Sequence, residues 1–276
     1  MKVVQNITEL RALVAEQKKH CSSIALVPTM GNLHEGHLSL IKKAKEDKNF
    51  VVTSIFVNPT QFGPNEDFNS YPRTLDADAE KITPYCDVIF APTVQEMYPS
   101  GTGMIVTEME KSKRLCGSFR AGHFDGVLTV VLKLLNICEP NSVYFGLKDY
   151  QQFVLVSDMI AKLNLDIKMV GCPLLREKDG LAMSSRNSYM DVAQRNRALA
   201  LVGSLRKVKE LFDGGITDVV HLKAQALQVL LPKVSPQYFE IVDPKSLEDV
   251  SVASKGCVVA VAAYCDKVRL IDNIIL

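Results

Sequence analysis

Short apolar runs, rich in β-branched residues, alternate with helical patterns over the first 170 or so residues of the chain. Strands are predicted at 24–27, 51–57, 88–90, 142–145 and 167–170. Helical spacing begins after Asn32 and recurs over 75–82, 126–138 and 150–163. Strands that alternate with helices are typical of βαβ units, so we expect an α/β fold with a Rossmann-like, doubly wound parallel sheet.

The pattern changes after residue 175. Residues 192–212 and 219–231 predict helices, and the turn at 213–215 separates them. The runs at 238–242, 257–264 and 268–271 then resemble antiparallel strands. We therefore expect two domains, a Rossmann-like domain over 1–175 and a smaller C-terminal α+β domain over 176–276.

The most informative segment is the histidine turn, residues 28–37, with the sequence Pro-Thr-Met-Gly-Asn-Leu-His-Glu-Gly-His. It joins a predicted strand to a predicted helix, and His34 and His37 share one face of the first helical turn. Free N–H groups and the helix dipole make such a turn a phosphate site, to which two imidazoles add donors, and positive charge if protonated. The alternatives are a packing pair or a metal pair, although zinc usually needs a third ligand, for which the spacing is not convincing.

Two further polar segments suit phosphate or ribose. Lys148 and Asp149 open a helix, where the lysine can contact phosphate and the carboxylate can accept ribose hydroxyls. Asp149 can equally cap that helix, with Gln152 in a position like that of a capping box. The segment 184–186, Ser-Ser-Arg, offers a phosphate clamp or a simple N-cap of the next helix.

The histidine turn, residues 58–63 and residues 146–149 all directly follow apolar runs. We expect them on one edge of the sheet, where ligands bind. Gln61 suits a hydroxy acid, because its amide donates to a carboxylate and accepts from a hydroxyl. An apolar wall, or ordinary core, is expected from Met30, Phe62 and Phe145.

Composition narrows the function classes. The net charge of +1 predicts no attraction to nucleic acid or anionic membranes. The chain has no apolar run of membrane-spanning length and no signal-peptide pattern. Its seven cysteines, an odd number without a CxxC pair, predict buried thiols in a reducing, cytoplasmic setting.

Taken together, the motifs resemble the pantoate–β-alanine ligase (pantothenate synthetase) family of the nucleotidylyltransferase superfamily. The matching segments cover nearly the whole chain and lie at 28–37, 56–62, 67–73, 122–127, 144–152, 176–187 and 269–273. The resemblance implies a homodimer that joins pantoate to β-alanine with ATP and Mg²⁺. Pantoyl adenylate would form first, pyrophosphate would leave, and β-alanine would then release AMP.

The resemblance also implies roles for individual residues. Phosphate would be stabilised by His34, His37 and Lys148, and pantoate would be held by Gln61, Gln152 and Met30. The nucleotide would be held by Thr29, Gly146, Asp149, Leu175, Ser184, Ser185 and Arg186. The smaller domain would close as a lid, and its segment 183–187 is expected to be exposed and flexible before ATP binds. Arg120 and His123 either reach the site or only shape a turn.

Two other functions stay open at this point. One is an adenylyl or cytidylyl transferase of the same superfamily with a dinucleotide product, which should lack the paired glutamines. The other is a non-catalytic nucleotide-binding regulator, which should have lost a histidine or the lysine.

Overall fold

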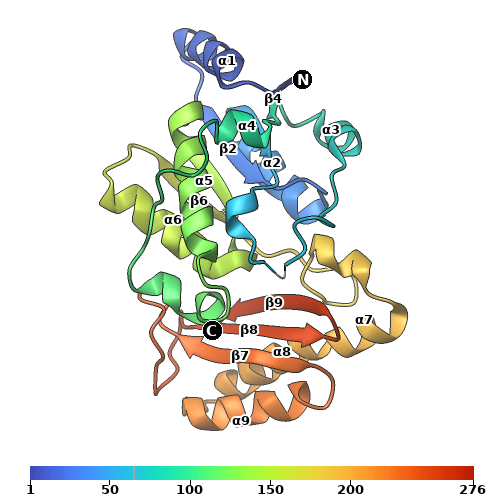
Figure 1. Ribbon diagram of the computed structural model, residues 1–276. Helices are drawn as coiled ribbons and strands as arrows, with labels where there is room; N and C mark the ends of the chain where they lie inside the picture. Colours follow the sequence, from blue (N-terminus) through green and yellow to red (C-terminus); the bar gives the residue numbers. More distant parts are fainter. Residues whose placement is uncertain (65) are drawn as a thin grey trace. The chain divides into compact units, whose positions relative to one another are not determined.

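The computed structural model describes residues 1–64 and 66–276, which divide into two compact units (Figure 1). The first unit comprises Met1–Ser112, Arg120–Leu147 and Gln152–Pro173. The second unit comprises Lys113–Phe119, Lys148–Gln151 and Leu174–Leu276. The short segments Lys113–Phe119 and Lys148–Gln151 therefore pack with the C-terminal part of the chain.

A parallel sheet forms the centre of the first unit. Its strands are β1 (Lys2–Val4), β2 (Ile24–Thr29), β3 (Phe50–Ile55), β4 (Val88–Phe90), β5 (Ser142–Gly146) and β6 (Lys168–Cys172), in the order β1-β4-β3-β2-β5-β6. Every described pairing between them is parallel. The chain runs from β2 to β3 and β4 on one side and adds β5 and β6 on the other. The order thus reverses between β2 and β5, the place where such sheets bind ligands.

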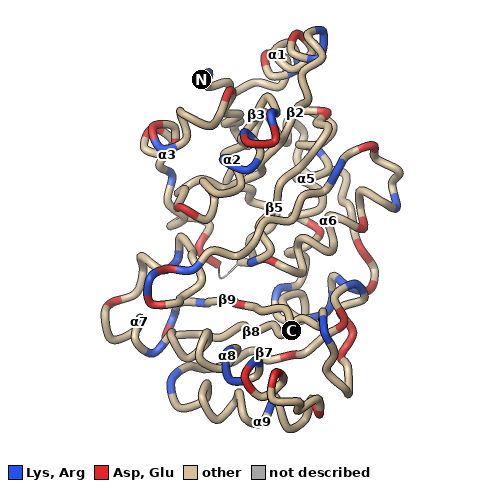
Figure 2. The backbone as a smooth tube through the Cα atoms, turned by 180° about the vertical axis from the view of Figure 1, so that it is seen from behind, with Lys and Arg blue, Asp and Glu red and all other residues tan. Residues whose placement is uncertain are grey.

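The described helices of the first unit have the bounds α1 (Ile7–Lys19), α2 (Glu35–Glu46), α3 (Leu75–Ile82), α4 (Val94–Met97) and α5 (His123–Cys138), and most of α6 (Tyr150–Lys162) belongs here too. The short 3-10 helix η1 (Pro59–Gln61) also belongs to the first unit, whereas η3 (Leu115–Ser118) and η5 (Ser185–Tyr189) belong to the second; two more are η2 (Lys111–Lys113) and η4 (Leu147–Asp149). Apolar residues of β2 and β3 pack with Leu38 and Ile41 of α2 and Ile82 of α3. Strands β2 to β5 carry no charged residue, and Figure 2 shows both signs of charge on the surrounding helices and loops.

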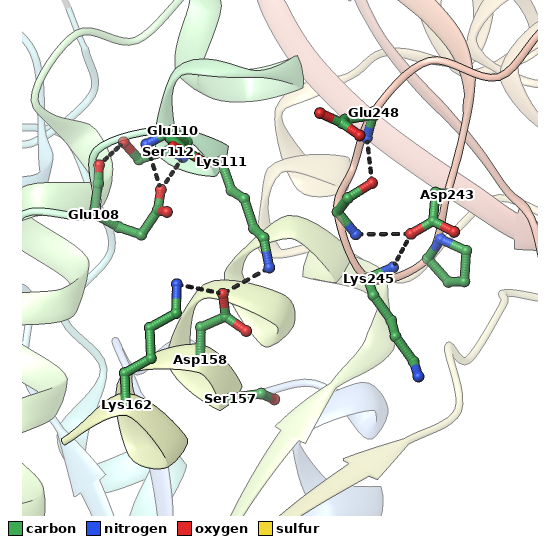
Figure 3. A network of polar contacts seen from close by, with 12 residues as sticks. Glu108, Glu110, Lys111, Ser112, Ser157, Asp158, Lys162, Asp243, Lys245 and Glu248 are labelled. Atoms are coloured by element: carbon green, nitrogen blue, oxygen red, sulfur yellow. Dashed lines mark hydrogen bonds and ion pairs between the residues drawn. The ribbon is translucent and has the colours of Figure 1, made fainter. Parts of the chain in front are cut away.

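An ion-pair network holds the turn at residues 108–112, where the first continuous part of this unit (Met1–Ser112) ends. Lys111 and Lys162 both donate to the carboxylate of Asp158 on α6, at 2.7 and 3.3 Å (Figure 3). Burial raises the pKa of Asp158, but the two lysines outweigh burial and hold that pKa below its ordinary value. The Glu108 carboxylate accepts from the N–H of Ser112, which orders the turn that carries Lys111.

The second unit is an α+β arrangement. Its described helices are α7 (Val192–Ala198), α8 (Ala200–Asp213) and α9 (Val219–Leu230), and its antiparallel sheet has the order β7 (Ser235–Val242), β8 (Val258–Cys265), β9 (Val268–Ile275). Leu201, Leu205 and Leu222 of the helices pack against Val259 and Val261 of β8. The fold class predicted from sequence is confirmed: a parallel, Rossmann-like α/β sheet and a smaller α+β part.

Two sequence predictions in the second unit need correction. The helix predicted over 192–212 is interrupted at Leu199, whose φ of −60° and ψ of −15° end α7 and begin α8. No glycine or proline marks this break, so the periodicity alone did not reveal it. The sequence predicts that the last strand ends at residue 271, but it continues to Ile275, because the buried side chains of Asp272 and Asn273 are hydrogen-bonded to Arg176 and to the Lys148 carbonyl.

The prediction that the cysteines are mostly buried is confirmed. All seven lie among the described residues and are free thiols, and six of them are buried, with Cys21 exposed. Burial raises the pKa of the Cys138 thiol to about 12. Within the described part of the chain, no helix is both long and apolar enough to cross a membrane.

Candidate functional site

The histidine turn leaves the end of β2 through two residues with left-handed backbone, Gly31 (φ +82°) and Asn32 (φ +51°). His34 then caps helix α2, and its Nδ1 accepts the N–H of Gly36 at 3.1 Å. Nδ1 of His37 in turn accepts the N–H of His34 at 3.4 Å. The two imidazoles form a reciprocal capping box, and their ring centres lie 4.1 Å apart.

This capping box determines the tautomer of both rings. A ring nitrogen that accepts from a backbone N–H must carry its lone pair there. Nδ1 therefore accepts in His34 and in His37, and the neutral ring holds its proton on Nε2. In this tautomer Nε2 carries a hydrogen-bond donor at a helix N-terminus, a kind of group that suits phosphate oxygens without a positive charge on the ring.

A buried carboxylate on α3 holds the turn in place. Asp78, with 0% exposure, accepts the N–H of Asn32 at 2.8 Å and the N–H of Leu33 at 2.7 Å. Thr74 donates to the same carboxylate, and Lys81 donates to the carbonyl of Leu33 at 2.8 Å. Asp78 was missed in the sequence, because an aspartate in a helix's first turn reads as a simple dipole partner.

Gln61 follows β3 within a closely bonded group. The side chain of Asn58, 1% exposed, donates to Oε1 of Gln61 at 3.2 Å and to the carbonyl of Gly126 at 3.1 Å. The Tyr98 hydroxyl donates to Oδ1 of Asn58 at 2.9 Å. Nε2 of Gln61 lies 3.0 Å from the sulfur of Met30. The fold therefore brings together Met30 and Gln61, and it orients the Gln61 amide through Asn58, which the sequence marked only as a turn residue.

His123 contacts the backbone of Gln61, and Arg120 contacts His123. Nδ1 of His123 lies 2.7 Å from the Gln61 carbonyl, which can only accept, so His123 donates from Nδ1. Nε2 of His123 then accepts from the Arg120 guanidinium at 2.7 Å. Arg120 donates two further bonds, both 2.6 Å long, to the carboxylate of Glu66. These contacts span 62 and 54 residues and had no signal in the sequence.

Helix α5 approaches this group at a glycine. A Cβ added to Gly126 would lie 2.2 Å from the carbonyl oxygen of Thr60, so only glycine fits there. A cavity of about 310 Å³ lies next to the same turns and is lined by Met30, Gly31, Phe56, Phe68 and Arg73, among others. Met30 thus lines this largely apolar cavity and also contacts the Gln61 amide.

The remaining first-unit candidates lie at the ends of two central strands and in helix α6. Thr29 ends β2 and donates to the carbonyl of Ser54 on β3 at 2.7 Å. Gly146 ends β5, which pairs with β2, and Gln152 is half-buried in the first turn of α6. The prediction that the turns after β2, β3 and β5 share one edge of the sheet is confirmed, since these strands are neighbours and parallel.

The other candidates belong to the second unit. Nζ of Lys148 lies 3.9 Å from the carboxylate of Asp149. Leu175 begins a short hairpin, and its carbonyl accepts the N–H of Met183 at 3.0 Å.

Ser184 caps the 3-10 helix η5, because its hydroxyl accepts the N–H of Arg186 at 3.3 Å. Ser184, Ser185 and Arg186 are all half-buried. The expectation that segment 183–187 is exposed is wrong, because the Asn187 side chain is buried and donates to Glu177 at 2.6 Å and to Ala182 at 3.0 Å.

No group of three His, Cys, Asp or Glu side chains among residues 1–64 and 66–276 is arranged to hold a metal ion. Both imidazoles of the histidine pair accept a backbone N–H of the turn through Nδ1.

A family model for pantoate-beta-alanine ligase matches residues 2–275. The chain belongs to the pantoate–β-alanine ligase family. Pantothenate synthetases from Fervidobacterium nodosum and Thermotoga neapolitana are 49% and 47% identical to it. Each comparison covers 100% of this chain and 99% or more of the relative. The chain is accordingly an enzyme of the pantoate–β-alanine ligase type.

Solved structures of the family have the same fold. Pantothenate synthetase from Thermus thermophilus superposes with a TM-score of 0.94 at 39% identity, over 99% of both chains. Pantoate-beta-alanine ligase from Francisella tularensis, solved in complex with beta-gamma ATP and beta-alanine, has a TM-score of 0.82 at 35% identity. That comparison covers 100% of this chain and 97% of the other.

Proposed function

We propose that this enzyme joins pantoate to β-alanine through a pantoyl-adenylate intermediate. The observation that supports the proposal most directly is the histidine capping box. It places two imidazoles, both with Nδ1 engaged as an acceptor, at a helix N-terminus that follows strand β2, next to the reversal of strand order. A family relative with beta-gamma ATP and beta-alanine bound supports ATP and β-alanine as substrates.

In the first step, a pantoate carboxylate oxygen attacks the α-phosphorus of ATP. A new P–O bond forms, the bond from the α-phosphorus to the bridging oxygen breaks, and pyrophosphate leaves. His34, His37 and Lys148 donate to the phosphate oxygens as negative charge develops on them. This chemistry depends mainly on positioning and charge stabilisation, with little covalent help from the protein.

In the second step, the amine of β-alanine attacks the acyl carbon. The C–O bond to AMP breaks, the amine loses a proton, and pantothenate and AMP are released. The acyl adenylate is reactive toward water, so we assign the smaller domain, over 176–276, a closing role over the first domain, 1–175.

Substrate binding is assigned by residue type and position. Gln61 and Gln152 contact the hydroxyl and carboxylate of pantoate, and Met30 packs against its methyl groups. The ATP site is assigned to Thr29, Gly146, Asp149, Leu175, Ser184, Ser185 and Arg186. Asp149 suits the ribose, and Ser184, Ser185 and Arg186 suit the β- and γ-phosphates.

We propose that Mg²⁺ binds together with ATP, as the MgATP complex. Mg²⁺ is often held by substrate phosphates with one or two carboxylates at most. In the proposed function Mg²⁺ therefore arrives bound to ATP, and no resident metal centre is assigned. We also propose a cytoplasmic homodimer, in keeping with the family resemblance.

The test is a set of product assays on the purified chain. AMP release should require both pantoate and β-alanine, and exchange of labelled pyrophosphate into ATP should require pantoate alone. That exchange without β-alanine would identify the adenylate as the intermediate. Formation of ADP, or of a dinucleotide product, would instead show a different reaction.

A further inference from the structure

The end of β9 bonds to the segment that carries Lys148. Asn273 on β9 is 8% exposed, and its side-chain N–H₂ donates to the backbone carbonyl of Lys148 at 2.8 Å. Both residues belong to the second unit, although residues on either side of 148–151 pack in the first. Asn273 therefore contributes to holding the Lys148 segment in the second unit.

The neighbouring residue on β9 bonds to a second segment. Asp272 is 3% exposed and accepts from both terminal nitrogens of Arg176, at 2.7 and 2.9 Å. The same guanidinium donates to the carbonyls of Gly180 at 3.1 Å and of Asn273 at 3.2 Å. Arg176 and Gly180 belong to the hairpin that leads into Ser184 and its 3-10 helix.

The two sets of contacts are joined within β9. The Asp272 carboxylate accepts the backbone N–H of Asn273 at 2.7 Å. The ion pair between Arg176 and Asp272 and the hydrogen bond from Asn273 to Lys148 are therefore connected. Burial raises the pKa of Asp272 despite the adjacent guanidinium. Apolar residues often stabilise such a position as well as a buried ion pair does, so stability alone is a weak reason for this pair.

We propose that Asp272 and Asn273 are positioning residues, which hold the Lys148 segment and the hairpin before Ser184–Arg186 in one arrangement. The inference rests on the proposed function, in which both segments face the nucleotide. This role explains why β9, an edge strand, has two buried polar residues at positions where apolar residues would also fit. Asn273 would affect the reaction by positioning Lys148. The Arg176–Asp272 pair would affect it by positioning the hairpin that leads into Ser184–Arg186.

The first test is Asn273→Ala with separate kinetic constants for each substrate. We expect kcat to fall about 10- to 100-fold, the scale of a small misplacement of a catalytic group, while KM for pantoate stays within about twofold. Asn273→Asp should show the same loss, because a carboxylate cannot donate to the Lys148 carbonyl. Gln237→Ala is the matched control, since it removes one hydrogen bond to Arg269 on the same sheet.

A double-mutant cycle distinguishes positioning from general stabilisation. If Asn273 acts through Lys148, Asn273→Ala should cost less than about twofold in a Lys148→Ala background. Arg176→Lys keeps the charge but loses the two-pronged contact, and it should raise KM for ATP more than KM for pantoate. Two results would overturn the inference: an unchanged kcat in both Asn273 variants, or a double variant whose loss is the product of the two single losses. In either case, pantothenate formation by the wild type would leave the proposed function standing. A wild-type chain without pantothenate formation would count against the proposed function itself.

Discussion

At the scale of single residues, the chemistry of the site depends on which atom of each side chain is already engaged. His34 and His37 use Nδ1 to cap α2, and this contact leaves Nε2 as the protonated nitrogen. His123 shows the opposite arrangement, with Nδ1 as donor to Gln61. Backbone partners thus give three histidines of one chain two different tautomers, each suited to its neighbour.

We expect His34→Ala and His37→Ala each to lower turnover by about two to three powers of ten, because each removes one preorganised donor to the transition state. Steady-state AMP release and thermal unfolding should be measured together. His20→Ala is a suitable control, since His20 is exposed at the end of α1 and contacts Glu16. Near-normal adenylate formation in either variant would remove that histidine from the site.

The Glu66–Arg120 pair predicts a pH dependence of stability. Burial raises the pKa of Glu66, but the hydrogen bonds and charge of Arg120 outweigh it, so the pKa lies below its ordinary value of 4.5. A depressed pKa in the folded state stabilises the fold above the unfolded-state pKa, and this stability is lost as pH falls through the folded-state pKa. The free-energy advantage of wild type over Glu66→Gln should therefore shrink in acid. An advantage that stays constant from about pH 7 to pH 3 would contradict the assignment.

At the scale of elements, the proposed pantoate pocket depends on how closely α5 approaches η1. The missing side chain of Gly126 lets the Thr60 carbonyl lie against the helix. Asn58 then bonds to both elements at once. Gln61 is positioned by this packing as well as by the strand that precedes it.

Gly126→Ala should displace η1, because the added Cβ would meet the Thr60 oxygen at 2.2 Å. We expect a loss of about 1–3 kcal/mol of stability, the usual cost of overpacking, and a raised KM for pantoate with KM for ATP nearly unchanged. Gly103→Ala is the control, since nothing lies within 4 Å of its added Cβ. An equal rise in both KM values would argue against a local effect on Gln61.

At the scale of the whole molecule, the proposal requires the second domain to exclude water from the acyl adenylate. In the segment 183–187, proposed to clamp the phosphates, residues 183–186 are half-buried and Asn187 is buried, around the 3-10 helix η5. Its local bonds, among them the Asn187 contacts, give it a defined shape. If the proposed ATP site is right, nucleotide binding stabilises a turn that is already formed and does not have to fold a disordered loop.

We expect amide hydrogen exchange to slow across residues 183–187, and near His34 and Lys148, when a non-hydrolysable ATP analogue is added. Peptides from α9, far along the chain from the proposed contacts, provide the internal reference. Unchanged exchange over 183–187 at saturating analogue would leave the second domain without a closing role.

Local patterns in the sequence were sufficient to predict the fold class and the turn that carries His34 and His37. Alternating apolar runs and helical spacing predicted both sheets, and the strand–turn–helix around His34 and His37 pointed to phosphate, because periodicity and capping act over a few residues. Contacts between distant residues were decided only by the tertiary structure. Asp78 reaches the histidine turn across 45 residues, and Asn273 reaches Lys148 across 125. Such partners leave no periodic trace, because a buried polar side chain finds its hydrogen bonds only after the chain has packed.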